Sequence, residues 1–387
     1  MAIGLTSPAT TLNRQQDLPQ LEQVVTVLDQ LDARSVFIVA DAEAYMATGA
    51  AARLQEVLGS CKTTLFTKIT HPPMETAVLE GIETLRQVRP DVVLAIGGGA
   101  ALDIAKVMNH LAAQIGEPAV LIRRKTGPAL PGRPLIAVPT TAGSGSEATH
   151  FALMHAEDGG MHLVSHAHMR PGYVVLDPAM TATQPAVVVA ATGISALALA
   201  LESIWNIQAN EGSIGYAQET VKLTLTHLKN ETLGVTNKGR IALLRAANFA
   251  GKSADLTDST FLMALAGGLA ARTGASYGQL AGALLGPMLE YNRQVGTADC
   301  ADLRGPHTVQ MRFVHIAQSL NVPSPADACG FLRQLLGNLQ IPTHLGAFGV
   351  NPSHAHDLAR ALPEKLYNTN TRRLKPPQIT KLIIEAI

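Results

Sequence analysis

Short apolar runs alternate with amphipathic segments over the first half of the chain. The runs SVFIVAD (35–41), TTLFTKI (63–69), DVVLAIGGG (91–99) and PLIAVPTT (134–141) predict strands. Helical spacing separates them, most clearly in ETAVLEGIETLRQV (75–88). Because strands that are apolar on both faces occur in parallel sheets covered by helices, this pattern predicts an α/β domain.

The pattern changes after YVVLDPAMTATQPA (173–186). From there on, Ala-, Leu-, Thr- and Gly-rich segments of helical period are broken only by short turns. We therefore expect an α/β domain over residues 1–180 and an all-helical domain over residues 181–387. A chain of 387 residues is long enough for two domains of ordinary size.

Two strands of the predicted sheet end in loops suited to a nucleotide. In AIGGGAALDIAK (95–106), three glycines lead from a strand into a helix, so that the backbone can approach a phosphate and helix N–H groups can bind it. PTTAGSGSEAT (139–149) places hydroxyls and bare backbone after another strand. Together the loops favour a nucleotide site over plain strand-to-helix turns. The candidate cofactor-binding residues here are Gly97, Gly98, Gly99, Asp103, Thr140, Thr141 and Ser144.

Asp41 ends the first of the strands named above. At this position a carboxylate can accept hydrogen bonds from an adenosine ribose and repel a 2′-phosphate, which favours NAD over NADP. A cap on the following helix accounts equally well for an Asp here. Local sequence leaves both explanations open, and we count Asp41 among the candidate cofactor residues.

The composition narrows the possible partners. Lys plus Arg and Asp plus Glu both number 30, and the charged fraction is 16%, below the roughly 25% of an average chain. No basic patch is evident, which argues against nucleic acid or an anionic membrane as a partner. Few charges with 47% apolar residues favour a surface covered by a second subunit. An Ala-rich monomer would show the same composition.

Three cysteines, none in a CxxC pair, argue against a disulfide framework or a thiolate metal site and fit a reducing compartment. The segment MAIGLTSPATTLNRQQ lacks the features of a secretory signal. The longest apolar run (186–201) is shorter than the roughly 20 residues that cross a bilayer. We expect a cytoplasmic protein.

Six motifs, in this order, resemble the iron-containing (group III) alcohol dehydrogenases. They are VFIVAD, AIGGGAALDIAK, PTTAGSGSEAT, VVLDPAMTATQP, ATGISALALALES and NTNTRRLKPPQITKLI. The match runs from about residue 35 to the end of the chain. The resemblance implies a dinucleotide-binding α/β domain followed by an all-α domain, the dehydroquinate synthase-like architecture. It also implies an NAD(H)-type cofactor and a small-molecule substrate in the cleft, and usually a homodimer.

The iron-containing alcohol dehydrogenases, which these motifs resemble, build their metal site from one Asp and three His. Their pattern TGxDALxHAxE reads TGISALALALE here, which puts Ser195 at the Asp position and Leu199 at the first His position. Their pattern HALAHPLGAxYxxPHG matches MALAGGLAARTGASYG without a gap, which puts Met263 and Tyr277 at the other two. Gly267 replaces a further His that usually contacts substrate. Hydroxyl, aliphatic, thioether and phenol groups are poor ligands for a hard divalent ion, so we expect no metal.

Two main hypotheses for function remain. The first is a metal-independent NAD(H)-dependent oxidoreductase acting on a small carbonyl or alcohol, in which the Tyr277 hydroxyl, with Ser195 as a second donor, supplies a proton. Leu199, Met263 and Gly267 would then line the substrate pocket. The second hypothesis is a non-catalytic homologue kept for ligand binding or assembly. Retained phosphate loops favour the first, because drift has no reason to spare them.

Three alternatives accompany these hypotheses. Arg272 would bind an anionic group of the substrate, although a solvated cation at a helix end accounts for it as well. Tyr277 would alternatively only fill the volume that a His and its metal vacated. A pocket repurposed for non-redox chemistry is also left open by the sequence.

Overall fold

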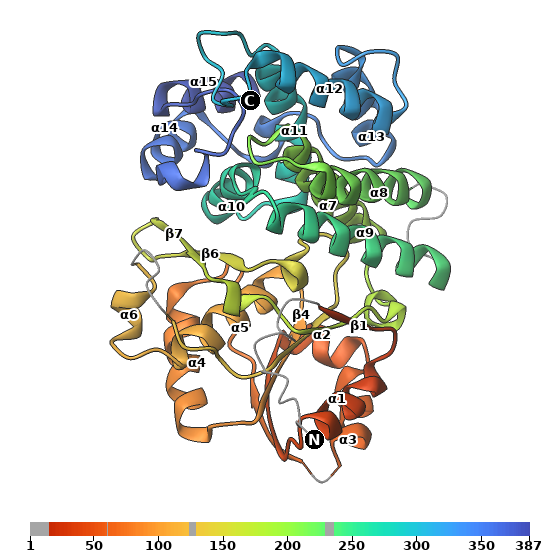
Figure 1. Ribbon diagram of the computed structural model, residues 1–387, viewed down its shortest axis with the longest axis vertical. Helices are drawn as coiled ribbons and strands as arrows, with labels where there is room; N and C mark the ends of the chain where they lie inside the picture. The colour runs from red at the N-terminus through yellow and green to blue at the C-terminus, as the bar shows by residue number, and fades with distance from the viewer. Residues whose placement is uncertain (1–14, 60, 124–128, 229–235) are drawn as a thin grey trace, which may run out of the picture.

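Six parallel strands form the sheet of the α/β half, which occupies one end of the molecule in Figure 1. The computed structural model describes residues 15–59, 61–123, 129–228 and 236–387. The strand order is β1-β8-β5-β4-β2-β3. The strands are β1 Gln16–Leu18, β2 Ser35–Ala40, β3 Lys62–Phe66, β4 Val92–Gly97, β5 Leu135–Pro139 and β8 Tyr173–Val175.

Both faces of this sheet are buried, as the apolar runs predict. In β2, Val36 and Ile38 pack into the core on one face with α1 and α3. Phe37 and Val39 point to the other face, into the core shared with α4 and α5. The helices of this half are α1 Val24–Gln30, α2 Ala42–Ala47, α3 Ala50–Leu58, α4 Glu75–Val88, α5 Gly99–Ala112 and α6 Pro118–Leu121.

The structure differs locally from the sequence pattern. The continuous helical segment that follows the first strand is divided into α2 and α3, because Gly49 adopts a left-handed conformation with φ of 74°. An antiparallel hairpin, β6 Phe151–His155 and β7 Met161–Ser165, lies outside the parallel sheet. The short strand β1 is a further element that the apolar pattern does not indicate.

The second half of the chain is helical over its described residues, which confirms the predicted class. Its helices are α7 Ala186–Trp205, α8 Glu211–His227, α9 Asn237–Asp255, α10 Phe261–Thr273, α11 Tyr277–Arg293, α12 Pro306–Leu320, α13 Asp327–Asn338, α14 Pro352–Ala361 and α15 Pro376–Glu385. Helix α7 is the central one and packs against α8, α9 and α11. Of the described helices it alone is long and apolar enough to span a membrane, but 78% of its most apolar stretch is buried inside the fold.

The two halves share apolar core. The cluster on the α4 and α5 face of the sheet continues through the β6–β7 hairpin into the helical half. A Cβ added at Gly267 or Gly268 of α10 would contact the side chains of Leu153 and Met161 from the hairpin. The last strand of the sheet ends at Val175.

Candidate active site

The glycine turn joins the centre of the sheet to α5. β4 ends at Gly97, whose φ of 150° favours glycine, and α5 begins at Gly99. A Cβ at Gly97 would lie 2.6 Å from the Cβ of Ala101, so no side chain fits there. No side chain caps α5 at Gly98, which leaves N–H groups of the first turn free to bind an anion.

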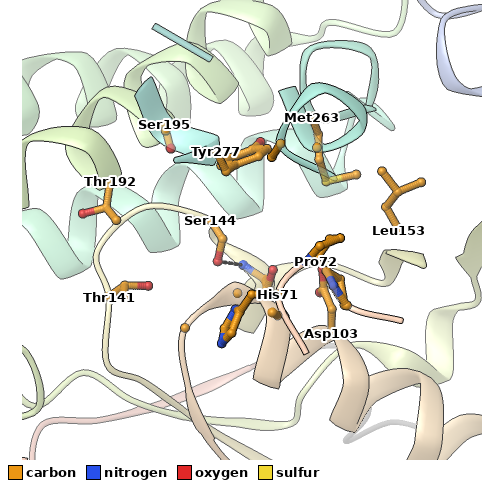
Figure 2. A pocket seen from close by; sticks show the side chains of 18 of the residues that line it. His71, Pro72, Asp103, Thr141, Ser144, Leu153, Thr192, Ser195, Met263 and Tyr277 are labelled. Atoms are coloured by element: carbon orange, nitrogen blue, oxygen red, sulfur yellow. Dashed lines mark hydrogen bonds between the residues drawn. The ribbon is translucent and has the colours of Figure 1, made fainter. Parts of the chain in front are cut away.

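The second loop follows β5 and touches the first. A Cβ at Gly99 would lie only 2.7 Å from the Cβ of Ser144. The Ser144 Oγ accepts a hydrogen bond from the Ser146 N–H at 3.2 Å, which is drawn in Figure 2. Thr140 is buried, whereas Thr141 and Ser144 border open space. The two loops therefore present hydroxyls and backbone N–H groups side by side.

The same loop is anchored in the helical half. Gly145 has a φ of 64°, and its backbone meets α9 so closely that a Cβ at Gly251 would lie 2.2 Å from the Gly145 carbonyl oxygen. Only two glycines can approach in this way. The contact fixes the second loop against α9 and so sets one wall of the space between the halves.

Asp41 fulfils one of its two predicted roles, that of a helix cap. Its Oδ1 accepts a hydrogen bond from the Ala44 N–H at 3.0 Å, so it caps α2. Its Oδ2 lies 3.0 Å from Nε2 of His71, a residue of the cavity wall. Partial burial opposes ionisation, but the hydrogen bonds from Ala44 and His71 outweigh it and lower the pKa of Asp41. The carboxylate is therefore charged at neutral pH.

A cavity of about 480 Å³ lies between the loops and helices α7, α10 and α11. In Figure 2, Thr141, Ser144 and Asp103 lie on one side of it and Ser195, Met263 and Tyr277 on the other. The predicted residues that line it are Gly98, Gly99, Asp103, Thr141, Ser144, Ser195, Leu199, Met263, Gly267 and Tyr277. The structure thus brings the candidate cofactor loops and the candidate substrate residues to one cavity.

The four positions that hold the metal ligands in the iron-containing alcohol dehydrogenases all line this cavity. Ser195 and Leu199 come from α7, Met263 from α10, and Tyr277 is the first residue of α11. Over the described ranges, no group of three or more His, Cys, Asp or Glu side chains could hold a metal ion. These residues do not fit the metal that the resembling family carries, because none of the four is a carboxylate or an imidazole.

Ser195 and Tyr277 differ in whether their hydroxyl groups are free to donate a hydrogen bond into the cavity. The Ser195 hydroxyl donates to the Ala191 carbonyl at 3.2 Å, one turn earlier on α7, so its hydrogen is already engaged. The Tyr277 hydroxyl has no hydrogen-bond partner among the described residues. Burial, with the negative charges of Glu202 and Asp103, raises the pKa of Tyr277. At neutral pH the phenol is protonated, and it is the better donor of the two.

Glu202 positions the helix that carries Met263 and Gly267. This carboxylate is buried at the end of the apolar run of α7 and accepts the N–H groups of Phe261 at 2.8 Å and Leu262 at 3.2 Å. It thereby serves as the cap that α10 otherwise lacks. Burial raises the pKa of Glu202 to about 7.

Asp103 reaches the cavity from α5 and is held by a buried lysine. The Lys106 Nζ lies 2.9 Å from Asp103 Oδ1 and donates to Thr149 Oγ1 at 2.8 Å and to the Phe151 carbonyl at 2.5 Å. Lys106 is 1% exposed. Because the lysine is fully enclosed by these acceptors, it orients Asp103 and cannot itself reach a substrate.

Arg272 lies elsewhere than the prediction requires. It is not among the described residues that line the cavity. Its guanidinium donates to the Gly268 carbonyl at 2.9 Å, one turn back on α10. The side chain therefore closes the C-terminal end of its own helix, and its positive charge acts on the cavity only from a distance.

Two histidines of the cavity wall were missed by sequence reasoning. His71 follows β3 and pairs with Asp41, and His155 ends β6 opposite Gly267. For His71 the flanking sequence HPP marks a rigid loop, which is a weak signal. For His155 no local signal exists, because its role depends on the fold of the hairpin against α10.

The glycine-rich loops of the α/β half and the Tyr277 hydroxyl of the helical half thus meet at one cavity at the junction of the halves. The chain belongs to the iron-containing alcohol dehydrogenase family. Residues 16–178 match the sequence model described as "Iron-containing alcohol dehydrogenase". Residues 189–387 match the model for the C-terminal part of the Fe-containing alcohol dehydrogenase family. The class of the chain is therefore that of an alcohol dehydrogenase-like oxidoreductase.

Curated relatives cover most of the chain. A phosphonoacetaldehyde reductase from Streptomyces viridochromogenes is 31% identical over 315 residues, which span 78% of this chain and 77% of the relative. A 4-hydroxybutyrate dehydrogenase from Cupriavidus necator is 25% identical over 368 residues, which span 93% of this chain and 94% of that protein.

Solved structures share the fold. An alcohol dehydrogenase from an archaeal halo-thermophilic Red Sea brine pool source superposes with a TM-score of 0.87 at 20% identity, covering 97% of both chains. A sulfoacetaldehyde reductase from Bifidobacterium kashiwanohense, solved with NAD⁺, has a TM-score of 0.80 at 21% identity and covers 95% of this chain and 96% of its own. These likenesses confirm the α/β plus all-α architecture.

Proposed function

We propose that the chain is a metal-independent, NAD(H)-dependent oxidoreductase that interconverts a small carbonyl compound and the corresponding alcohol. One observation carries the proposal: both nucleotide-type loops border the cavity, while the four family ligand positions in the same cavity hold no metal ligands. A site whose chemistry had been lost altogether would have no reason to keep both loops.

The cofactor proposal rests on the first half of the chain. Gly98 and Gly99 would receive the pyrophosphate at the uncapped start of α5. The charged Asp41, at the end of β2, would repel a 2′-phosphate and so favour NADH over NADPH. The reductase of the same fold that binds NAD⁺ supports this choice.

The chemistry can be assigned to the chain's own residues without a metal. The nicotinamide ring supplies a hydride to the carbonyl carbon when bound, and accepts it in the reverse direction. Tyr277, protonated at neutral pH, gives its hydroxyl proton to the carbonyl oxygen. An alkoxide is a stronger base than a phenolate, so this transfer is downhill even with the raised pKa of Tyr277.

The lining favours an uncharged substrate. Two relatives are named for substrates with an anionic group, phosphonoacetaldehyde and 4-hydroxybutyrate. In this chain no Lys or Arg is among the described residues of the cavity wall, and Arg272 is engaged with its own helix. Phe151, Leu153, Leu199 and Met263 make much of the wall apolar. We therefore favour an aldehyde or ketone without a charged group.

The assembly and location follow from composition and family only. We propose a cytoplasmic homodimer that has neither nucleic acid nor membrane as a partner. The charged fraction of 16% and the absence of a charge imbalance support this proposal. Light scattering of the purified protein tests the dimer.

The experiment is NADH oxidation against a panel of uncharged and anionic aldehydes, with metal content measured on the same sample. We expect turnover of uncharged aldehydes that survives dialysis against a chelator. Tyr277→Phe should lower kcat by about 10²-fold or more, the usual scale for losing a general acid. Ser195→Ala is the matched control, with a small expected effect because its hydroxyl bonds to its own helix. Turnover lost with chelator and restored by a metal would refute metal independence. No turnover across the panel would favour the non-catalytic homologue.

A further inference from the structure

His155 brings an imidazole to the place from which the family's substrate-contacting histidine is missing. Gly267 occupies that position on α10, and a Cβ built there would lie 3.6 Å from His155 Nε2 and 3.8 Å from its Cε1. The ring thus reaches across from the hairpin of the α/β half to fill the space beside Gly267. It lies within the cavity wall.

The backbone of His155 is held on both sides. Its N–H donates to the Pro73 carbonyl at 2.9 Å, and Met74 forms a parallel bridge with it. On the other side it pairs with Met161 in the β6–β7 hairpin. Because its backbone is paired on both sides, the fold fixes the face of the hairpin on which the His155 side chain lies.

The imidazole is enclosed but has no partner. His155 is 5% exposed, and neither ring nitrogen forms a hydrogen bond with any described residue. Because the ring lines the cavity and its nitrogens are not engaged by the protein, they are available to a ligand group in the cavity. Burial, helped by the positive charge of Arg272, lowers the pKa of His155 to about 4, so the ring is neutral at neutral pH.

We propose that His155 donates a ring N–H to the carbonyl oxygen of the substrate and is a catalytic residue of the proposed reaction. A neutral imidazole polarises a carbonyl without bringing a charge into an apolar cavity. This role is the one that a metal ion would otherwise fill. The proton that ends on the oxygen comes from Tyr277, and the imidazole keeps its own. The assignment rests on the oxidoreductase function proposed above.

The test compares His155→Phe, which keeps an aromatic ring without a donor, with His155→Gln, whose amide keeps a donor. His155→Phe should lower kcat/KM for the best uncharged aldehyde by about 10² to 10³-fold, the range for losing one oxyanion donor. NADH affinity should change by less than about twofold. His155→Gln should recover at least a tenth of the wild-type value. The matched control is His162→Phe, since His162 lies in the same hairpin but pairs with Glu75 outside the cavity.

A second readout does not need turnover. A primary carboxamide that mimics the aldehyde should bind the NADH complex of the wild type and of His155→Gln at least tenfold more tightly than that of His155→Phe. A wild-type kcat/KM in a folded His155→Phe variant, or equal carboxamide affinity in all three proteins, would overturn the role of His155 and leave the oxidoreductase function standing. A wild type without turnover of any aldehyde would overturn the oxidoreductase function, and the role of His155 with it.

Discussion

Replacing Gly251 with Ala tests the contact that fixes the second loop. The new Cβ would lie 2.2 Å from the Gly145 carbonyl oxygen, and ordinary contact begins near 3.4 Å, so the loop and α9 must separate by about 1.2 Å (3.4 minus 2.2). The oxygen belongs to the backbone and the position of the Cβ is fixed by its own backbone, so neither can rotate away. Overpacking of this kind costs about 1–3 kcal/mol, and we take the upper end. Alanine in place of glycine inside a helix returns about 1 kcal/mol. We expect a net loss of about 2 kcal/mol.

The matched control is Gly215→Ala in α8. A Cβ there has no heavy atom within 4 Å, so only the helix-propensity gain of about 0.5–1 kcal/mol applies. The same substitution should therefore move stability in opposite directions at the two sites. Urea unfolding followed by far-UV circular dichroism measures both. Because the loop after β5 moves with Gly145, NADH affinity should also fall several-fold in Gly251→Ala and stay unchanged in Gly215→Ala. A Gly251→Ala protein as stable as the wild type would refute the close contact. Reduced stability with normal NADH binding would separate this loop from the cofactor.

Three further outcomes are expected. Asp41→Gly should raise NADPH affinity towards that for NADH in titrations of nicotinamide fluorescence, because the repelling carboxylate is removed; an unchanged preference would leave Asp41 as a helix cap only. The pKa of Glu202 is raised from 4.5 to about 7 in the folded protein, so its contribution is present below pH 4.5 and is lost as the pH rises towards 7. Wild type should thus lose up to about 3 kcal/mol over this window relative to Glu202→Gln in urea unfolding at each pH; parallel curves would contradict the raised pKa. Restoring all four family ligands should create affinity for zinc or iron, detectable by elemental analysis and by a metal-dependent rise in melting temperature. A quadruple variant that binds no metal would show that the four positions do not converge as described. The substitutions are Ser195→Asp, Leu199→His, Met263→His and Tyr277→His.

The parts of the fold that the sequence predicted are those with a regular apolar period. The run from Val36 to Val39 alternates between two buried faces, and the segment 75–88 forms α4 with the bounds that its spacing indicates. The division between α2 and α3 was missed because one glycine with a positive φ interrupts an otherwise helical pattern. Strand β1 has only three residues, too few for a period to be recognised.

The residues of the candidate site that lie on sequence motifs could be predicted. Gly98, Gly99 and the four metal positions lie on contiguous motifs, and the structure gathers them at one cavity. His155 lies on none of these motifs, and the capping role of Glu202 could not be read from the motif TGISALALALE that it ends. The first acts across the junction with α10 and the second caps a helix 59 residues further along the chain, so both depend on tertiary packing. For Arg272 the sequence allowed both an anion site and a cation at a helix end, and only the structure shows that the side chain lies at the end of its own helix.

The shared core between the two halves has a consequence for how this chain can be rearranged. Sequence comparison treats residues 16–178 and 189–387 as separate units. The apolar cluster that contains Met154 and Met161 of the hairpin also contains Leu265 and Leu269 of α10, so a cut between the units would expose both surfaces to water. We therefore expect that neither unit can be moved into another protein unless the new partner covers its apolar surface.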